Sequence, residues 1–467
     1  MRDAVLAATN REVAMQFETD SLQLLTEGLK TLQEGFAFLP PDEAMTPGAA
    51  RVAEVMAETA KRLHNNFPYF HPLYAGQMLK PPHPLARAAY ALATWINPNN
   101  HALDGGRASS AMEKEAVGEI AAMFGWREFL GHLSSGGTMA NLEALWVAGR
   151  LHPGKRIVAS ELAHYTHSRI SNVLGLKFRA VACDSRARMD VAALEGILKA
   201  DDVGCVVATV GTTGTGSLDP VPEILRLRER YKFRLHVDAA YGGYFTLASN
   251  LMPETRAIFD AIGQADSLVV DPHKHGLQPY GCGCVLFRDP AVGAIYKHES
   301  PYTYFTSGDL HLGEISLECS RAGASAVALW ATQKLLPLIP GAEFAAGLEA
   351  CRAAALDLTK RLRADARWLL PVAPELDIVV WARRARAASG ISELSRRIFD
   401  AAAKQNLHLA LMRLPVRYLT ALDASVEPDE DSALCLRSVL MKPQHREWTA
   451  RLWEILNQAA DEVAAGN

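Results

Sequence analysis

The chain has 467 residues, of which 49% are hydrophobic and 21% are charged, and its formal net charge at pH 7 is -4. This composition is typical of a globular protein with roughly two to four domains of about 150 residues each. Because no strongly basic surface is implied, we expect neither nucleic acid nor an anionic membrane as a partner.

The N-terminal residues and the cysteines indicate the cellular compartment in which the protein is expected. Residues 1–17 lack the continuous apolar core of a signal peptide, and no stretch reaches the roughly 18 apolar residues of a membrane span. The seven cysteines are scattered, which is typical of reduced thiols and predicts a cytoplasmic protein. Cys282 and Cys284 form a C-x-C pair, but further ligands are missing nearby, so we expect no metal site.

The first part of the chain is predicted to be helical. Apolar residues recur with helical spacing in residues 21–36, 49–63 and 85–96, whereas residues 67–84 are rich in proline and aromatic residues and read as a loop. Each of the first two helices would expose an apolar face to solvent unless another part of the protein covers it. We therefore expect residues 1–90 to form a helical dimerisation segment.

The middle of the chain alternates between two patterns. Short apolar runs are separated by amphipathic helical stretches, and this alternation predicts an α/β domain with a largely parallel sheet. The runs are RIVAS, KFRAVAC, CVVATVG, RLHVDAA, SLVVD and CGCVLF. We place this large domain at residues 91–335. Residues 336–467 mix helices with strand candidates at 377–383 and 433–441 and are expected to form a smaller α+β domain.

Two segments of the α/β region could bind a phosphate or a flat ring. Residues 134–138, SSGGT, precede a clean helix pattern, where glycines and the helix N-terminus suit an anion, although a plain helix cap fits equally well. His164 and His167 are three residues apart and follow a strand. They could be metal ligands, a planar lid for an aromatic ligand, or ordinary surface histidines.

Two charged residues stand where strands are expected to end. Asp238 follows an apolar run and precedes small residues, and a carboxylate at that depth needs a cationic partner. Lys274 stands between two histidines after the next run, where an amine is costly to bury unless it has a chemical role. The glycines of residues 211–216 have the wrong spacing for a dinucleotide fingerprint.

An anion cradle, a flat surface, a carboxylate and an amine are together the requirements of pyridoxal 5′-phosphate. The sequence resembles the group II pyridoxal-phosphate-dependent amino-acid decarboxylases, which include aromatic-amino-acid, glutamate, cysteine-sulfinate and diaminobutyrate decarboxylases. The resemblance extends from His71 to residues 436–443, and HVDAAYGG and DPHK are its most specific parts. It implies a fold-type I enzyme with a mostly parallel seven-stranded sheet, and a homodimer with the active site at the interface.

The resemblance also implies roles for residues around the cofactor ring. Lys274 matches the Schiff-base lysine and Asp238 the partner of the pyridinium nitrogen. His164 matches the histidine that stacks on the ring, and Ala240 matches the small residue beneath it.

Further positions follow from the same resemblance. Gly137 and Thr138 fall where the family binds the phosphate, Thr213 lies where a threonine approaches the ring hydroxyl, and His273 lines the site. Asp271 departs from the asparagine or serine of some members. An acid would be an awkward neighbour for a phosphate, so Asp271 is not expected to bind the cofactor.

Catalytic and substrate-side candidates lie elsewhere. In the family a tyrosine on a mobile loop protonates Cα, and Tyr302 and Tyr304 in segment 297–323 are both candidates, although they could also be packing residues. Gln77 and Arg437 match residues that lie near the substrate, and either could equally be structural.

The expected activity is therefore decarboxylation of an L-amino acid to the amine and carbon dioxide. One alternative with the same cofactor is a carbon–carbon lyase that acts on an amino alcohol or a β-hydroxy amino acid. The other alternative is a scaffold protein without catalytic activity. The sequence does not identify the substrate amino acid. Gln77 favours an acidic amino acid, whereas the aromatic residues of 67–74 favour an aromatic one.

Overall fold

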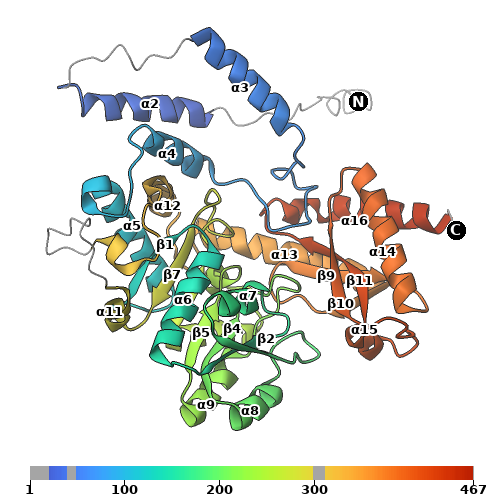
Figure 1. Cartoon of the computed structure of the whole chain (residues 1–467). Coiled ribbons are helices and arrows are strands. Elements are labelled where there is room, and N and C mark those ends of the chain that lie inside the picture. The colour runs from blue at the N-terminus through green and yellow to red at the C-terminus, as the bar shows by residue number, and fades with distance from the viewer. Residues whose placement is uncertain (1–19, 39–48, 298–310, 466–467) are drawn as a thin grey trace, which may run out of the picture.

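The computed structural model describes residues 20–38, 49–297 and 311–465 (Figure 1). Tyr302 and Tyr304 lie outside these ranges. In the described part of the chain, no helix combines the length and the apolar character that crossing a bilayer would require.

The N-terminal helices follow the predicted pattern. Their bounds are α2 (Asp20–Glu34), α3 (Ala49–Leu63), α4 (Pro84–Thr94) and α5 (Leu103–Met123). Helix α2 packs against α4, whereas α3 extends away from the rest of the chain (Figure 1). Apolar side chains on both α2 and α3 are exposed, including Leu22, Leu24, Val55 and Met56. Only α5 was not singled out by the sequence pattern.

A seven-stranded sheet forms the centre of the molecule, as expected for fold-type I. Its strands are β1 (Leu130–Ser134), β2 (Arg156–Ser160), β3 (Lys177–Val181), β4 (Val203–Thr209), β5 (Arg234–Asp238), β6 (Ser267–Val270) and β7 (Gly283–Phe287), in the order β1-β7-β6-β5-β4-β2-β3. Strand β7 is antiparallel to both of its neighbours, and the other pairings are parallel. Every residue of β4 is buried, which explains its uninterrupted apolar sequence.

Helices connect successive strands of this sheet or follow its last strand. They are α6 (Gly137–Leu151), α7 (Thr166–Val173), α8 (Val191–Ala200), α9 (Val221–Tyr231), α10 (Pro253–Ala261), α11 (Gly293–Tyr296) and α12 (Gly323–Leu335). Because crossovers between parallel strands bring successive strands back in the same direction, the carboxyl ends of β2, β4, β5 and β6 meet at one edge of the sheet. The residues singled out as candidates after these strands are thereby brought together.

The C-terminal third forms its own sheet with helices packed against it (Figure 1). Its elements are α13 (Glu343–Ala364), β8 (Trp368–Val372), β9 (Ile378–Arg383), α14 (Ala388–Lys404), β10 (Ala410–Pro415), α15 (Arg417–Leu422), β11 (Ser432–Val439) and α16 (His445–Ala465). The antiparallel strand order is β10-β11-β9-β8, so both predicted strands are central. The domain boundaries at residues 90 and 335 stay predictions.

Candidate active site

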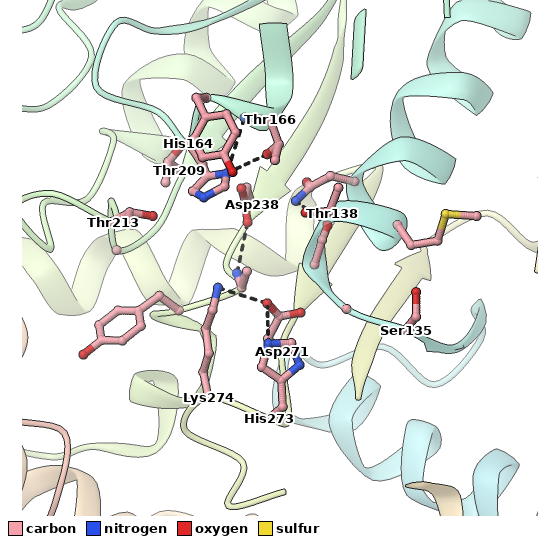
Figure 2. Close-up of a pocket in the computed structure, with 18 residues that line it drawn as sticks. Ser135, Thr138, His164, Thr166, Thr209, Thr213, Asp238, Asp271, His273 and Lys274 are labelled. Carbon is pink, nitrogen blue, oxygen red and sulfur yellow. Dashed lines mark hydrogen bonds and ion pairs between the residues drawn. The ribbon is translucent and has the colours of Figure 1, made fainter. Parts of the chain in front are cut away.

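A cavity of about 380 Å³ lies at the carboxyl edge of the large sheet (Figure 2). All eight residues that the sequence suggested for the cofactor line it, although they come from five separate segments of the chain. They are Gly137, Thr138, His164, Thr213, Asp238, Ala240, His273 and Lys274. Asp271, which was not expected to bind the cofactor, lines the same cavity.

Lys274 lies in the turn after β6 and extends into the cavity (Figure 2). Its Nζ is 3.0 Å from Oδ2 of Asp271, whose side chain is only 2% exposed. The other carboxylate oxygen of Asp271 is buried and has no hydrogen-bond partner among the described residues. The lysine amine is therefore held by an ion pair, and the acid that holds it is itself only partly satisfied.

Asp238 ends β5, and its carboxylate is held on both oxygens. Nε2 of His167 lies 2.8 Å from Oδ2, and the backbone N–H of Ala240 donates to Oδ1 at 3.1 Å. Burial alone would raise the pKa of Asp238, but the hydrogen bond from His167 and the positive charge of Lys274 hold this pKa below its ordinary value. Asp238 is therefore a buried carboxylate that is charged at neutral pH and lines the cavity.

His167 is a site residue whose role the sequence did not reveal. The sequence pattern left it open as a metal ligand, a planar lid for an aromatic ligand or a surface histidine, but it lies in the first turn of α7 with its side chain buried. His167, Ile170 and Ser171 form the buried face of this helix. That helical spacing is the one signal in the sequence that could have indicated an inward-facing histidine.

His164 precedes α7 and lines the cavity with its ring. Its Nδ1 lies 2.7 Å from Oγ1 of Thr166, which restrains the orientation of the ring. Burial lowers the pKa of His164, and the charge of nearby Lys274 lowers it further although Asp238 opposes them. The imidazole is therefore neutral at pH 7 and presents an uncharged flat surface. His164 and His167 have different partners, Thr166 and Asp238.

The N-terminus of α6 forms the opposite wall of the cavity. Gly136 has a φ of +152°, which few residues other than glycine adopt. A Cβ on Gly137 would lie 2.5 Å from Oδ2 of Asp271, so a side chain is excluded there too. The backbone N–H groups at the start of this 15-residue helix are thus open to the cavity, an arrangement that fits a phosphate group.

Gln77 and Arg437 do not line this cavity. The guanidinium of Arg437 is buried, and its Nε and Nη2 donate to the backbone carbonyls of Gly214 (2.9 Å) and Thr213 (2.6 Å). Its Nη1 lies 3.2 Å from Oε1 of Gln77. Arg437 therefore joins β11 of the small sheet to the turn that carries Thr213.

Comparisons with known proteins give a consistent result. The family model described as the pyridoxal-dependent decarboxylase conserved domain matches residues 51–384. A probable L-tyrosine/L-aspartate decarboxylase from Methanothermobacter thermautotrophicus is 32% identical over 335 residues, which cover 69% of this chain and 85% of that protein. An L-tyrosine decarboxylase from Enterococcus faecium is 30% identical over 387 residues, covering 61% of this chain and 63% of the relative.

Solved structures show the same fold. The crystal structure of Oryza sativa TDC with PLP and tryptamine covers 95% of this chain and 96% of its own, with a TM-score of 0.77. The two sequences are 18% identical, so this likeness concerns the fold.

Proposed function

Since the chain belongs to the pyridoxal-dependent decarboxylase family and is a pyridoxal-phosphate-dependent amino-acid decarboxylase, we propose that Lys274 is the residue that holds the cofactor. The observation that carries this proposal is that the Lys274 amine, the Asp238 carboxylate and the N-terminus of α6 line one cavity. An amine for the aldehyde, an anion for the ring nitrogen and a phosphate site are the three groups that the cofactor needs.

The cofactor, when bound, supplies a sink for the electron pair that remains at Cα after carbon dioxide leaves. In our proposal Asp238 keeps a proton on the ring nitrogen, because its carboxylate stays charged in its buried position. His164 offers a neutral planar surface to the ring. Gly137 and Thr138 receive the phosphate, and Thr213, Ala240 and His273 complete the walls.

The test of the Lys274 assignment is covalent trapping. Borohydride reduction of the purified holoenzyme should fix the cofactor on the peptide that contains Lys274, as identified by mass spectrometry. Lys274→Ala should lose the visible absorbance of the lysine-bound cofactor and amine production together. Recovery of the label on another lysine, or normal turnover by Lys274→Ala, would remove Lys274 from this role.

We propose that the proton delivered to Cα comes from Tyr302 or Tyr304, which resemble the loop tyrosine of the family. Replacing the correct tyrosine with phenylalanine should leave carbon dioxide release intact while amine yield falls, with oxygen consumed and the aldehyde and ammonia formed in place of the amine. The other phenylalanine variant serves as the matched control. If both variants form amine at the wild-type rate, another group supplies the proton.

For the substrate we propose L-tyrosine or L-aspartate, on the basis of the activities named for the similar proteins. Decarboxylation at C1 would yield tyramine or β-alanine respectively. Chromatographic detection of the amine from each amino acid in separate reactions distinguishes the two. Formation of neither product, with turnover of a different amino acid, would contradict this choice. The relatives are named as decarboxylases, so the carbon–carbon lyase alternative receives no support from them.

The oligomeric state and the cellular compartment of the protein are also proposals. We propose a homodimer because α2 and α3 expose apolar side chains that the rest of the described chain does not cover. Deleting residues 1–66 should then give an aggregating or inactive protein, and a stable active monomer in light scattering would contradict it. We place the protein in the cytoplasm, where seven unpaired cysteines, six of them buried, would stay reduced.

A further inference from the structure

A buried carboxylate from the C-terminal sheet lies beside the turn that follows β6. Asp377 immediately precedes β9, and its side chain is fully buried. Its backbone carbonyl accepts the N–H of Leu440, just after β11, at 2.9 Å. The side chain of Leu376 lies so close to Gly211 and Gly242 that a Cβ on either glycine would come within 3.2 Å of it. The four-stranded sheet therefore holds Asp377 firmly against the turns that follow β4 and β5.

Asp377 contacts two segments at the edge of the large sheet, one with each carboxylate oxygen. The hydroxyl of Tyr241, which follows β5, donates to Oδ1 at 2.6 Å. Nε2 of His275, which follows β6, lies 3.2 Å from Oδ2. Neither Oδ2 nor this nitrogen forms a hydrogen bond with any other residue that the structure describes. One carboxylate thus joins the ends of two neighbouring parallel strands.

His275 directly follows Lys274 in the chain, and the two side chains have different surroundings. Lys274 lines the active-site cavity, whereas His275 is fully buried and is not among the residues that line that cavity. The ring of His275 packs edge-on against the rings of Tyr241 and Phe245, with centroid separations of 4.8 and 4.9 Å. Because the peptide bond between neighbouring residues is rigid, a contact that fixes His275 also restrains the backbone from which the Lys274 side chain extends.

The Tyr241 hydroxyl determines which way the carboxylate of Asp377 faces. The terminal torsion of an aspartate side chain is broad, so a carboxylate without partners would rotate. A hydrogen bond on Oδ1 restrains this rotation and leaves Oδ2 towards His275. Lys80 and Arg437 lie within electrostatic range of Asp377, but neither is hydrogen-bonded to its side chain among the described residues. Tyr241 and His275 are therefore the two groups that this carboxylate holds.

The contact between Asp377 and His275 does not require a charged ring. Burial lowers the pKa of His275, so its imidazole is neutral at pH 7 and carries one N–H. A carboxylate only accepts hydrogen bonds, so the favourable tautomer has that proton on Nε2. The aromatic rings around His275 supply weakly directional packing, and the carboxylate adds the contact that fixes the direction of the ring.

We propose that Asp377 is a positioning residue for Lys274, which it keeps directed into the cavity by holding the ring of His275. The Tyr241 hydroxyl orients the carboxylate for this contact. The proposal rests on the proposed function, because it concerns how the Lys274 amine meets the aldehyde of the cofactor. The amine and the aldehyde join with loss of water, a step that depends on the distance and angle between the two groups. Asp377 acts only through its neighbours, since it does not line the cavity itself.

The test measures how fast the full-length protein, freed of cofactor, takes up pyridoxal 5′-phosphate, followed by the visible absorbance of the lysine-bound form. Asp377→Ala should slow uptake by about tenfold or more, since a shift of about 1 Å in a reacting group can cost about 100-fold. Asp377→Asn, whose amide can still accept from Tyr241 and reach His275, should recover most of the rate. Equilibrium binding of pyridoxine 5′-phosphate, which has an alcohol in place of the aldehyde, should be unchanged in both Asp377 variants. This last measurement separates the orientation of the lysine from a general loss of the cavity.

Glu349→Ala is the matched control. Glu349 lies on α13 and also presents a carboxylate to the region after β5, because its Oε1 accepts the N–H and the hydroxyl of Ser249 at 2.8 and 2.7 Å. It does not line the active-site cavity, so its uptake rate should equal that of the wild type. Tyr241→Phe, which removes a single oxygen atom, should also slow uptake and decides the question if Asp377→Ala does not fold.

Uptake at the wild-type rate by Asp377→Ala or, where that variant does not fold, by Tyr241→Phe would overturn the positioning role. An equal loss of uptake and of pyridoxine 5′-phosphate binding in Asp377→Ala would overturn it as well. Borohydride reduction of the wild-type holoenzyme tests the proposed function separately. Label on Lys274 together with unchanged uptake in the variants overturns the positioning role alone, whereas label on another lysine overturns both.

Discussion

Nε2 of His167 lies 2.8 Å from Oδ2 of Asp238, and both side chains are buried. The histidine belongs to α7 and does not line the cavity, whereas Asp238 lines the cavity together with Lys274 (Figure 2). A buried carboxylate is stable only when its charge is matched by hydrogen bonds or a partner charge. His167 thus sets both the orientation and the charge of Asp238.

Replacing His167 tests this relationship. His167→Phe keeps the bulk but removes the hydrogen bond, so the pKa of Asp238 should rise and the acid limb of the kcat profile should move to higher pH. We expect a loss of activity of about 10–100-fold, the size of effect found when a partner that orients a metal ligand is removed. His167→Gln, which retains an N–H donor, should recover part of the loss. An unchanged kcat and pH profile in His167→Phe would show that His167 serves packing alone.

Asp271 offers a second prediction, because it places a negative charge beside the N-terminus of α6 and 3.0 Å from Lys274. Asp271→Asn keeps the shape but removes a charge that repels the phosphate. Titration of the apoenzyme with pyridoxal phosphate, followed by fluorescence, should therefore show tighter binding by a factor on the order of ten, about 1.4 kcal/mol. Asp260→Asn, an exposed change on α10, is the control. Weaker binding by Asp271→Asn would mean that the acid assists the cofactor.

Arg437 should contribute to the stability of the fold. Its guanidinium donates to the carbonyls of Thr213 and Gly214, and each hydrogen bond of this charged kind is worth about 1.5–3 kcal/mol. Arg437→Met should lower the thermal unfolding temperature, and Arg437→Lys should lower it less. Arg386→Met, on the surface, should leave it unchanged. A rise in KM for the amino acid without any loss of stability would instead favour direct contact with the substrate.

The protein should lose stability below pH 6.5 through His236. Burial lowers the pKa of His236 to about 3, whereas an unfolded histidine titrates near 6.5. Between these two values the unfolded chain binds more protons, so the free energy of unfolding falls as the pH falls, by up to about 1.4 kcal/mol per pH unit.

Urea unfolding at pH 7 and pH 5 measures this dependence. His236→Asn should show a shallower loss between the two pH values, because asparagine does not titrate. Asp219, whose pKa burial raises to about 6, acts in the opposite direction, but it is present in both proteins and cancels in the comparison. Parallel curves for wild type and His236→Asn would exclude His236 as the source.

The pattern of the amino-acid sequence predicts the main architecture and the residues that line the cavity. Uninterrupted apolar runs such as β4 are typical of strands buried on both faces, and their alternation with helices implies parallel order. Once the strands are parallel, their carboxyl ends lie at one edge, so Asp238 and Lys274 had to approach each other although they are distant in the sequence. The same reasoning places Gly137 and Thr213 at that edge.

Which side chains pair across that edge depends on how the helices and the two sheets pack together. The partner of Asp238 is His167, because α7 docks with one particular face towards β5, and sequence spacing identifies a buried face but not what it meets. Arg437 reaches the carbonyl of Thr213 because the small sheet packs against the turn after β4, a contact between distant parts of the chain. Backbone periodicity is a local property, whereas these hydrogen bonds depend on how separate elements are packed together.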